Sequence, residues 1–153
     1  ILTSDLPAVP AFVDDLLRRS GLASDDAVAV ELGLALREVL VNAIEHGNLG
    51  VTFDEKNHAL ETGTLAALLA ARRADPARAS RRIRVQAWLR SPELRIQVTD
   101  EGGGFDWRRL PDPEDLERLL AAHGRGVLLA RCSVDELSYN EAGNEVTLSK
   151  RLA

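Results

Sequence analysis

The chain has 153 residues, enough for one domain with a sizeable core, and we expect residues 1–153 to form a single domain. Its formal net charge of −5 argues against a nucleic-acid-binding surface, because such surfaces are usually basic. No apolar run approaches the ~20 residues that a membrane helix needs, and the first residues show no signal-peptide pattern, so we expect no membrane segment.

The N-terminal third predicts a short strand and two helices. Residues 1–3 read as the tail of a strand, and a helix within residues 5–22 should end near Ser20-Gly21. Its apolar positions recur at helical spacing: Val9, Phe12, Val13, Leu16 and Leu17. Ser24 or Asp25 should cap a long second helix, and Gly47 should end it in the left-handed conformation.

This second helix is largely apolar but carries one narrow polar stripe. At about 100° per residue, the stripe falls within roughly 60° of the helix circumference. It consists of Glu31, Glu38, Asn42 and Glu45. The simplest interpretation is a face exposed to water. Asn42 weighs against it, because asparagine is a poor helix former that gains nothing at a plain surface position.

After Gly50 the pattern is less regular as far as Ala79, with one helix from about Thr64 to Ala74 that stops near Pro76. A basic cluster in this region is expected to form a solvated helix and connector. It consists of Arg72, Arg73, Arg78, Arg81 and Arg82. Alternating apolar residues then predict two strands within residues 82–99, joined as a hairpin at Ser91-Pro92-Glu93.

The C-terminal third predicts two helices and two strands. Asp112-Pro113-Glu114 is a typical start for a helix that runs to about His123, and another helix should begin near Gly126. Strands follow over residues 134–139 and 145–151. Helices followed by mostly antiparallel strands indicate an α+β, two-layer sandwich, with a mixed but mostly antiparallel sheet and its helices on one face.

The sulfur-containing and tryptophan residues give three further expectations. Cys132 is the only cysteine, which excludes an intrachain disulfide and favours a cytoplasmic protein, with the thiol as a small buried hydrophobe. We expect Trp88 and Trp107 to lie in the core. Because the chain contains no methionine, we expect it to be excised from a longer protein.

Two glycine-rich segments could contact a ligand. In Asp100-Glu101-Gly102-Gly103-Gly104-Phe105, the glycines allow close backbone approach, and the Asp100 carboxylate could accept a hydrogen bond from an exocyclic amine. A flexible loop is the alternative. In His123-Gly124-Arg125-Gly126, the free amides of the following helix could hold phosphates, although Gly124 could simply end the preceding helix. Neither the Walker A pattern nor the Rossmann fingerprint fits.

Taken together, Glu38-x-x-x-Asn42, Asp100-x-Gly102-x-Gly104 and Gly124-x-Gly126 resemble the N, G1 and G2 boxes of the GHKL ATP-binding superfamily. The resemblance spans nearly the whole chain and implies the Bergerat ATP-binding fold. The runs 38–48 and 100–106 look most like anti-sigma-factor serine kinases of the RsbW and SpoIIAB type. The cofactors so implied are ATP and Mg²⁺.

The resemblance implies a role for each matching residue. Glu38 would be the general base, and Asn42 would bind Mg²⁺. Asp100 would hold the adenine amino group, with Gly102 and Gly104 shaping its pocket. The remaining implied residues would lie near the phosphates or the adenine: Gly124, Arg125 and Gly126 in the lid, and Thr147 on the last strand, which could also be an ordinary strand residue. Glu45 and His46 could contact the metal region, but a more remote or partner-facing position is the simpler expectation.

The leading functional hypothesis is a protein serine/threonine kinase that phosphorylates a STAS-domain anti-sigma-factor antagonist in a bacterial partner-switching pathway. The segment 51–81 is longer than in the compact anti-sigma kinases and resembles versions attached to receiver or phosphatase domains, which leaves direct binding of a sigma factor open. The alternatives are a nucleotide-dependent binding module with little transfer activity and the ATP-binding domain of a larger histidine kinase. Whether the chain forms a homodimer also stays open.

Overall fold

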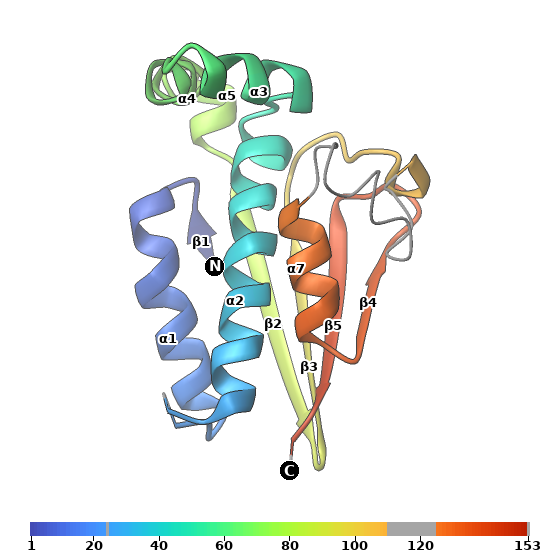
Figure 1. The fold of residues 1–153 in the computed structure, drawn as a ribbon. Coiled ribbons are helices and arrows are strands. Elements are labelled where there is room, and N and C mark those ends of the chain that lie inside the picture. Colours follow the sequence, from blue (N-terminus) through green and yellow to red (C-terminus); the bar gives the residue numbers. More distant parts are fainter. Residues whose placement is uncertain (24, 110–124, 153) are drawn as a thin grey trace.

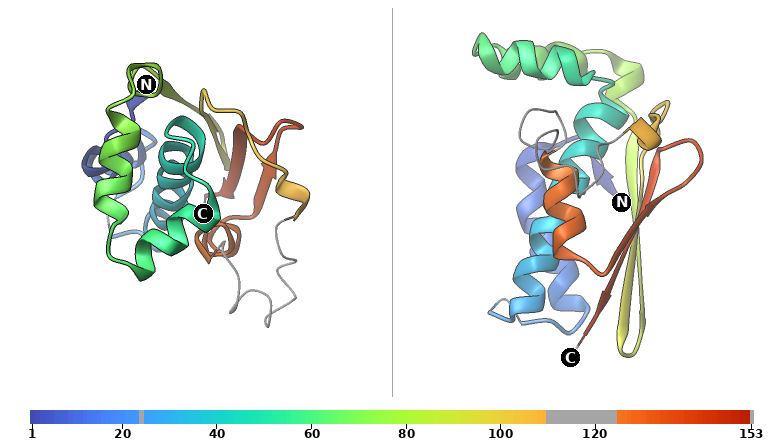
Figure 2. Two further views of the ribbon diagram at one scale, coloured as in Figure 1. Left: turned by 90° about the horizontal axis from the view of Figure 1, so that it is seen from above. Right: turned by 45° about the vertical axis from the view of Figure 1, so that its right-hand side comes forward.

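The computed structural model describes residues 1–23, 25–109 and 125–152. In this part of the chain, one antiparallel sheet of five strands is covered on one face by helices, as Figure 1 and the right-hand view of Figure 2 show. The strand order is β1-β2-β3-β5-β4. The strands are β1 (Leu2–Thr3), β2 (Arg82–Arg90), β3 (Glu93–Thr99), β4 (Glu136–Tyr139) and β5 (Glu145–Arg151). The predicted α+β class is confirmed.

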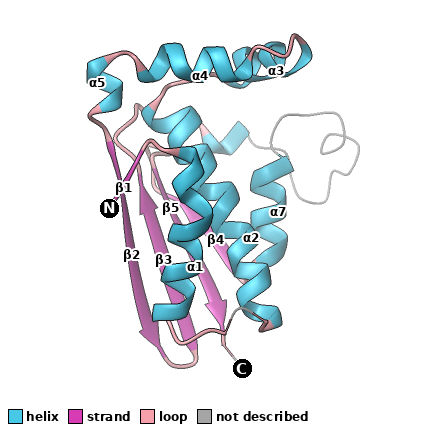
Figure 3. Ribbon diagram, turned by 90° about the vertical axis from the view of Figure 1, so that its left-hand side faces the viewer, coloured by secondary structure: helices cyan, strands magenta, loops and turns pink. Residues whose placement is uncertain are grey.

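Six α-helices accompany the sheet in the described residues. They are α1 (Val9–Arg19), α2 (Ala27–Asn42), α3 (Phe53–Glu61), α4 (Leu65–Arg73), α5 (Pro76–Ala79) and α7 (Arg125–Ser133). Helices α1, α2 and α7 lie along the sheet, whereas α3, α4 and α5 form an arm across one end of α2 (Figure 3). The helix expected over residues 112–123 lies outside the described residues.

The core lies between the sheet and the helices that run along it. Leu32, Leu36 and Leu40 of α2 are at most 1% exposed. They pack with strand residues of matching alternation, Ile83, Leu94, Ile96 and Leu148. Burial of these side chains supplies most of the driving force for the fold, since each contributes about 1.5–3 kcal/mol relative to an exposed position.

Three expectations about single side chains were wrong. Trp88 is 40% exposed near the tip of the β2–β3 hairpin, and its neighbour Leu89 is 53% exposed. Trp107 is only partly buried, with its indole N–H donating to the Asn140 carbonyl at 2.8 Å. Cys132 is exposed on α7. Each residue lies away from the α2–sheet contact where burial is complete.

The long second helix differs from its prediction at both ends. Its N-cap is Asp26, whose carboxylate accepts from the Ala23 N–H at 3.0 Å, and not Asp25, while Ser24 lies outside the described residues. At the other end the helix does not stop at Gly47. It continues as a π-helical turn, Ala43–Asn48, here called the π segment, and the left-handed residue is Gly50, with φ of +62°.

Helix α3 lies in the stretch that the sequence pattern left irregular. Thr52 and Glu55 form a reciprocal capping box at its start, in which the Glu55 N–H donates to the Thr52 hydroxyl at 3.2 Å. Helix α4 has the bounds expected from the sequence, between Thr64 and Ala74. In the described residues, no helix is long and apolar enough to cross a membrane.

Candidate functional site

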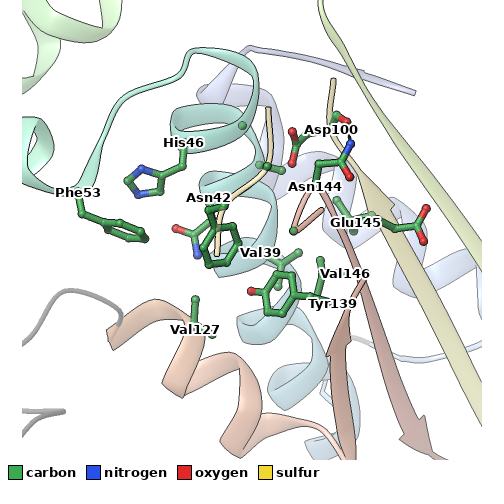
Figure 4. Close-up of a pocket in the computed structure, with 16 residues that line it drawn as sticks. Val39, Asn42, His46, Phe53, Asp100, Val127, Tyr139, Asn144, Glu145 and Val146 are labelled. Atoms are coloured by element: carbon green, nitrogen blue, oxygen red, sulfur yellow. Dashed lines mark hydrogen bonds between the residues drawn. The ribbon is translucent and has the colours of Figure 1, made fainter. Parts of the chain in front are cut away.

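A pocket opens between the C-terminal end of α2, the first turn of α7, the loop after β3 and the turn between β4 and β5 (Figure 4). Its cavity volume is about 50 Å³. The walls are mostly apolar, with Val39, Val98, Phe105, Val127, Tyr139 and Val146. A few polar side chains converge on this apolar space, which is the usual composition of a small-molecule site.

Asn42 and Glu38 lie on consecutive turns of α2, so they share one face of the helix. Asn42 lines the pocket, with His46 and Phe53 on one side and Asp100 and Asn144 on the other in Figure 4. Glu38 lies one turn further from Asp100, beside Gly126 of α7. A Cβ atom on Gly126 would come within 2.2 Å of Glu38 Oε2. The absence of a side chain at Gly126 therefore lets α7 pack against this carboxylate.

Asp100 follows the last residue of β3 and lies at the base of the pocket. Its Oδ1 accepts from the Gly102 N–H at 2.8 Å, and its own N–H donates to the Asn144 carbonyl at 2.9 Å. Burial raises the pKa of Asp100 to about 6, against the opposing effects of the Gly102 hydrogen bond and the Arg81 charge. The group therefore remains an ionised acceptor at neutral pH.

Close backbone approach explains the glycines around Asp100. A Cβ on Gly102 would lie 2.3 Å from the Gly47 carbonyl oxygen, and one on Gly104 would lie 1.9 Å from that of Ala142. Gly47 itself faces the Asp100 carboxylate, because a Cβ there would lie 2.4 Å from Asp100 Cγ. Glycine is therefore needed at position 47 to leave room for the Asp100 carboxylate, and not to end the helix.

One of the implied residues lies elsewhere, and the segment implied to be the lid is described only from Arg125 onward. Thr147 lies on the opposite face of the sheet, where it lines a separate depression with Trp88 and Gln97. The neighbouring Val146 takes the position in the pocket, because successive strand residues point to opposite faces. Arg125 begins α7, and Gly124 lies outside the described residues.

The polar residues that form one stripe in the sequence pattern differ in their exposure to solvent. Glu31 is exposed and forms an ion pair with Lys150 at 2.8 Å, as expected of a surface residue. Glu45 is 4% exposed and its carboxylate forms an ion pair with Lys56 of α3 at 2.5 Å. The interpretation of the whole stripe as a face exposed to water therefore fails at Glu45, which α3 covers.

Aromatic rings line the pocket, and sequence reasoning assigned neither Phe53 nor Tyr139 to a site. The rings of His46 and Phe53 are 4.2 Å apart, and Phe105 meets Tyr139 edge-on at 5.2 Å. Burial lowers the pKa of His46 below its usual value, although a bond at 2.5 Å between Nδ1 and the Val51 carbonyl opposes the shift. Burial also raises the pKa of Tyr139 to about 12, so both groups are neutral at pH 7.

The residues present fit a purine nucleotide with its metal ion. Apolar walls suit the faces of a base, and a carboxylate at their end suits its exocyclic amine. Within the described ranges, no group of three or more His, Cys, Asp or Glu side chains could hold a metal ion. Mg²⁺ bound through the Asn42 oxygen, phosphate oxygens and water needs no such group.

A comparison with known protein families shows to which family the chain belongs. Residues 66–150, more than half of the chain, match the histidine kinase-like ATPase domain. The match contains the Asp100 loop and Gly126, whereas Glu38 and Asn42 precede it. No curated protein sequence matches the chain. Domains of this type bind ATP, usually with Mg²⁺. The chain belongs to the family of histidine kinase-like ATPase domains.

Proposed function

We propose that this domain is an ATP- and Mg²⁺-dependent protein serine/threonine kinase of the anti-sigma-factor type, whose substrate is a STAS-domain antagonist. The observation that carries the proposal is the line of functional groups along one side of α2: Glu38 beside Gly126, then Asn42 in the pocket, then Asp100 at its base. The kinase class and the substrate class rest on the resemblance of runs 38–48 and 100–106 to the anti-sigma-factor kinases.

Each of the three side chains has one task. Asp100 accepts a hydrogen bond from the base, and Asn42 holds the metal ion through its amide oxygen. When bound, Mg-ATP supplies the γ-phosphoryl group and neutralises charge on it. Glu38 would take the proton of the acceptor hydroxyl. The oxygen of that hydroxyl would form the new bond to phosphorus while the bond between phosphorus and the leaving ADP oxygen breaks.

The position of Glu38 suits a base rather than a second metal ligand. It lies about one helical turn, or ~5.4 Å, from Asn42 along the axis, on the side away from Asp100. If Asp100 held the base of a nucleotide and Asn42 its metal ion, Glu38 would be the next functional group along α2 and could take a proton near the terminal phosphate. A pure nucleotide-binding module needs no carboxylate at this position.

Replacing Asn42 with Ala should reduce transfer from labelled ATP to a STAS-domain partner by at least about 100-fold, because the metal loses its only protein ligand in the proposed site. Glu38→Gln should retain ATP binding and lose about 10²–10⁴-fold in transfer rate. Circular dichroism would check that both variants are folded. Wild-type transfer by Asn42→Ala would refute the assignment.

Glu31→Gln is the matched control, since Glu31 belongs to the same helix and stripe but is exposed and bound to Lys150. It should transfer phosphate like the wild type. A complex with the partner that depends on ATP but leaves no label on it would favour the binding module instead. Label that is lost in acid from a histidine of a longer parent chain would favour the histidine kinase.

A further inference from the structure

Three arginines bind three consecutive backbone carbonyls at the end of the π segment. Arg72 and Arg78 belong to the arm, and Arg81 belongs to the short connector to β2, which is counted with the arm from here on. Arg81 Nη1 donates to the Asn48 oxygen at 2.8 Å, Arg78 Nη1 to that of Leu49 at 2.6 Å, and Arg72 Nη1 to that of Gly50 at 3.2 Å. All three guanidinium groups are part-buried in these contacts. The expectation of a solvated basic cluster was therefore wrong for these residues.

The arrangement satisfies groups that a helix end would otherwise leave unpaired. The last carbonyls of a helix lack partners within it, and cations at this end interact favourably with the helix dipole. The three contacts span 33, 29 and 22 positions of sequence. They hold residues 48–50 in place from outside, through the segment that also forms the arm.

Arg81 acts closest to the base of the pocket. The Asn48 side chain is fully buried, and its Oδ1 accepts from the N–H of Glu101, the residue after Asp100, at 3.0 Å. Gly47, the residue before Asn48, lies against the Asp100 carboxylate. Arg81 therefore fixes, through the Asn48 carbonyl, the short stretch of backbone that supports Asp100 from two directions.

We propose that Arg81 is a positioning residue for Asp100, and that the arm thereby sets the preference of the pocket for a base that carries an exocyclic amine. This inference rests on the proposed function, in which Asp100 accepts a hydrogen bond from that amine. Arg81 itself makes no contact with the nucleotide in this proposal. Its effect passes through Asn48 and through its charge.

The charge of Arg81 also favours Asp100 as an acceptor, in addition to the support that Arg81 gives through Asn48. Burial disfavours the ionised carboxylate of Asp100, and the positive charge of Arg81 lowers the pKa of that group and partly offsets the burial. A protonated Asp100 would donate a hydrogen bond where the exocyclic amine requires an acceptor. Other ionisable groups on the elements around Asp100 include Glu45 and His46 on the π segment, Glu101 and Asp106 on its own loop, Tyr139 on β4, Glu141 in the turn after it and Glu145 on β5.

The test compares affinities of the purified chain for ATP and for inosine triphosphate, which carries a carbonyl in place of the amine. Calorimetric titration from mildly acid to mildly alkaline pH gives both dissociation constants. The wild type should prefer ATP by about tenfold or more, as one charge-assisted hydrogen bond allows. Arg81→Gln should lose most of this preference at neutral pH. As the pH is lowered, the variant should lose ATP affinity at a higher pH than the wild type does, because its Asp100 becomes protonated earlier.

Arg73→Gln is the matched control, because Arg73 is an exposed arginine of the same arm, and it should behave as the wild type. A folded Arg81→Gln with the wild-type preference and pH profile would overturn the inference alone. If Arg81→Gln does not fold, Arg81→Lys decides, since it keeps the charge but weakens the bond to Asn48: a reduced preference supports positioning, and an unchanged one overturns it. A wild type that binds neither nucleotide overturns the proposed function as well.

Discussion

Asp100 shows how the requirements of binding and of stability oppose each other at one residue. Its carboxylate lines a mostly apolar pocket, where burial disfavours the charge that a hydrogen bond from a base amine requires. In the folded chain, one hydrogen bond from Gly102 and the charge of Arg81 oppose this effect only in part. The free chain is therefore less stable than it would be with a neutral group there.

Replacing Asp100 with Asn should abolish ATP binding yet stabilise the chain at pH 7. The folded pKa of about 6 exceeds the ordinary 3.8, so the folded state binds more protons between these values. Stability consequently falls as pH rises through this window and stays lower above it. After allowance for solvent screening, the free energy of unfolding of Asp100→Asn should exceed that of the wild type by about 1–2 kcal/mol at neutral pH. The asparagine oxygen can still accept the hydrogen bond from Gly102.

Urea unfolding of both proteins measures this difference. The stabilisation by Asn should disappear at about pH 4, where the aspartate of the folded protein is protonated. An advantage of the same size at both pH values would show that it comes from the shape of the amide and not from the absence of charge.

At the scale of elements, the π segment brings the helix end against the Asp100 loop. Gly47 lies inside this turn and faces the Asp100 carboxylate, whereas Gly103 of the loop has nothing within 4 Å of its Cβ direction. Gly47→Ala should therefore force the two elements apart, cost about 1–3 kcal/mol of stability and weaken ATP binding. Gly103→Ala should leave ATP affinity nearly unchanged. Equal affinities of the two variants would argue against this close contact.

The sequence predicted the elements better than their ends. The alternation in residues 82–99 and the helical spacing within residues 5–22 depend on local pattern, and both predictions were confirmed. The predicted end of the second helix was wrong because two glycines, Gly47 and Gly50, lie close together in the sequence and either could have ended it. Gly47 stays in the π segment and packs against the Asp100 carboxylate, which is distant in sequence, whereas Gly50 takes the positive φ.

Two of the missed features had a signal in the sequence. Thr52-x-x-Glu55 is a capping box that could have indicated α3, but the weakly apolar helix after it obscured the pattern. The apolar residues Val146 and Leu148 on either side of Thr147 could have placed Thr147 on the far face of β5. The arginine contacts had no such signal, since carbonyl acceptors are the same in every residue.

At the scale of the whole molecule, Asn48 joins three segments that are distant in sequence. Its Nδ2 donates to the Ser4 hydroxyl at 3.1 Å, its Oδ1 accepts from Glu101, and its backbone oxygen accepts from Arg81. The N-terminal segment, the arm and the loop at the base of the pocket thus meet at one fully buried amide.

Asn48→Ala should destabilise the chain by about 2–4 kcal/mol, because it leaves the buried Ser4 hydroxyl and the part-buried Glu101 N–H without their partner. Ser4→Ala should cost only about 1 kcal/mol. Denaturant unfolding of the two variants and of the double variant would give the coupling between the residues.

The two variants should differ more in ATP binding than in stability if Asn48 positions the pocket. Of these two residues, Asn48 is the one bonded to Glu101, so Asn48→Ala should weaken ATP binding, whereas Ser4→Ala should retain the wild-type affinity under conditions where both are fully folded. A loss of affinity in Ser4→Ala as large as that in Asn48→Ala would mean that the N-terminal segment supports the pocket as a whole. Arg81 would then share the positioning of Asp100 with the N-terminal segment around Ser4, and selectivity for the base would not belong to the arm alone.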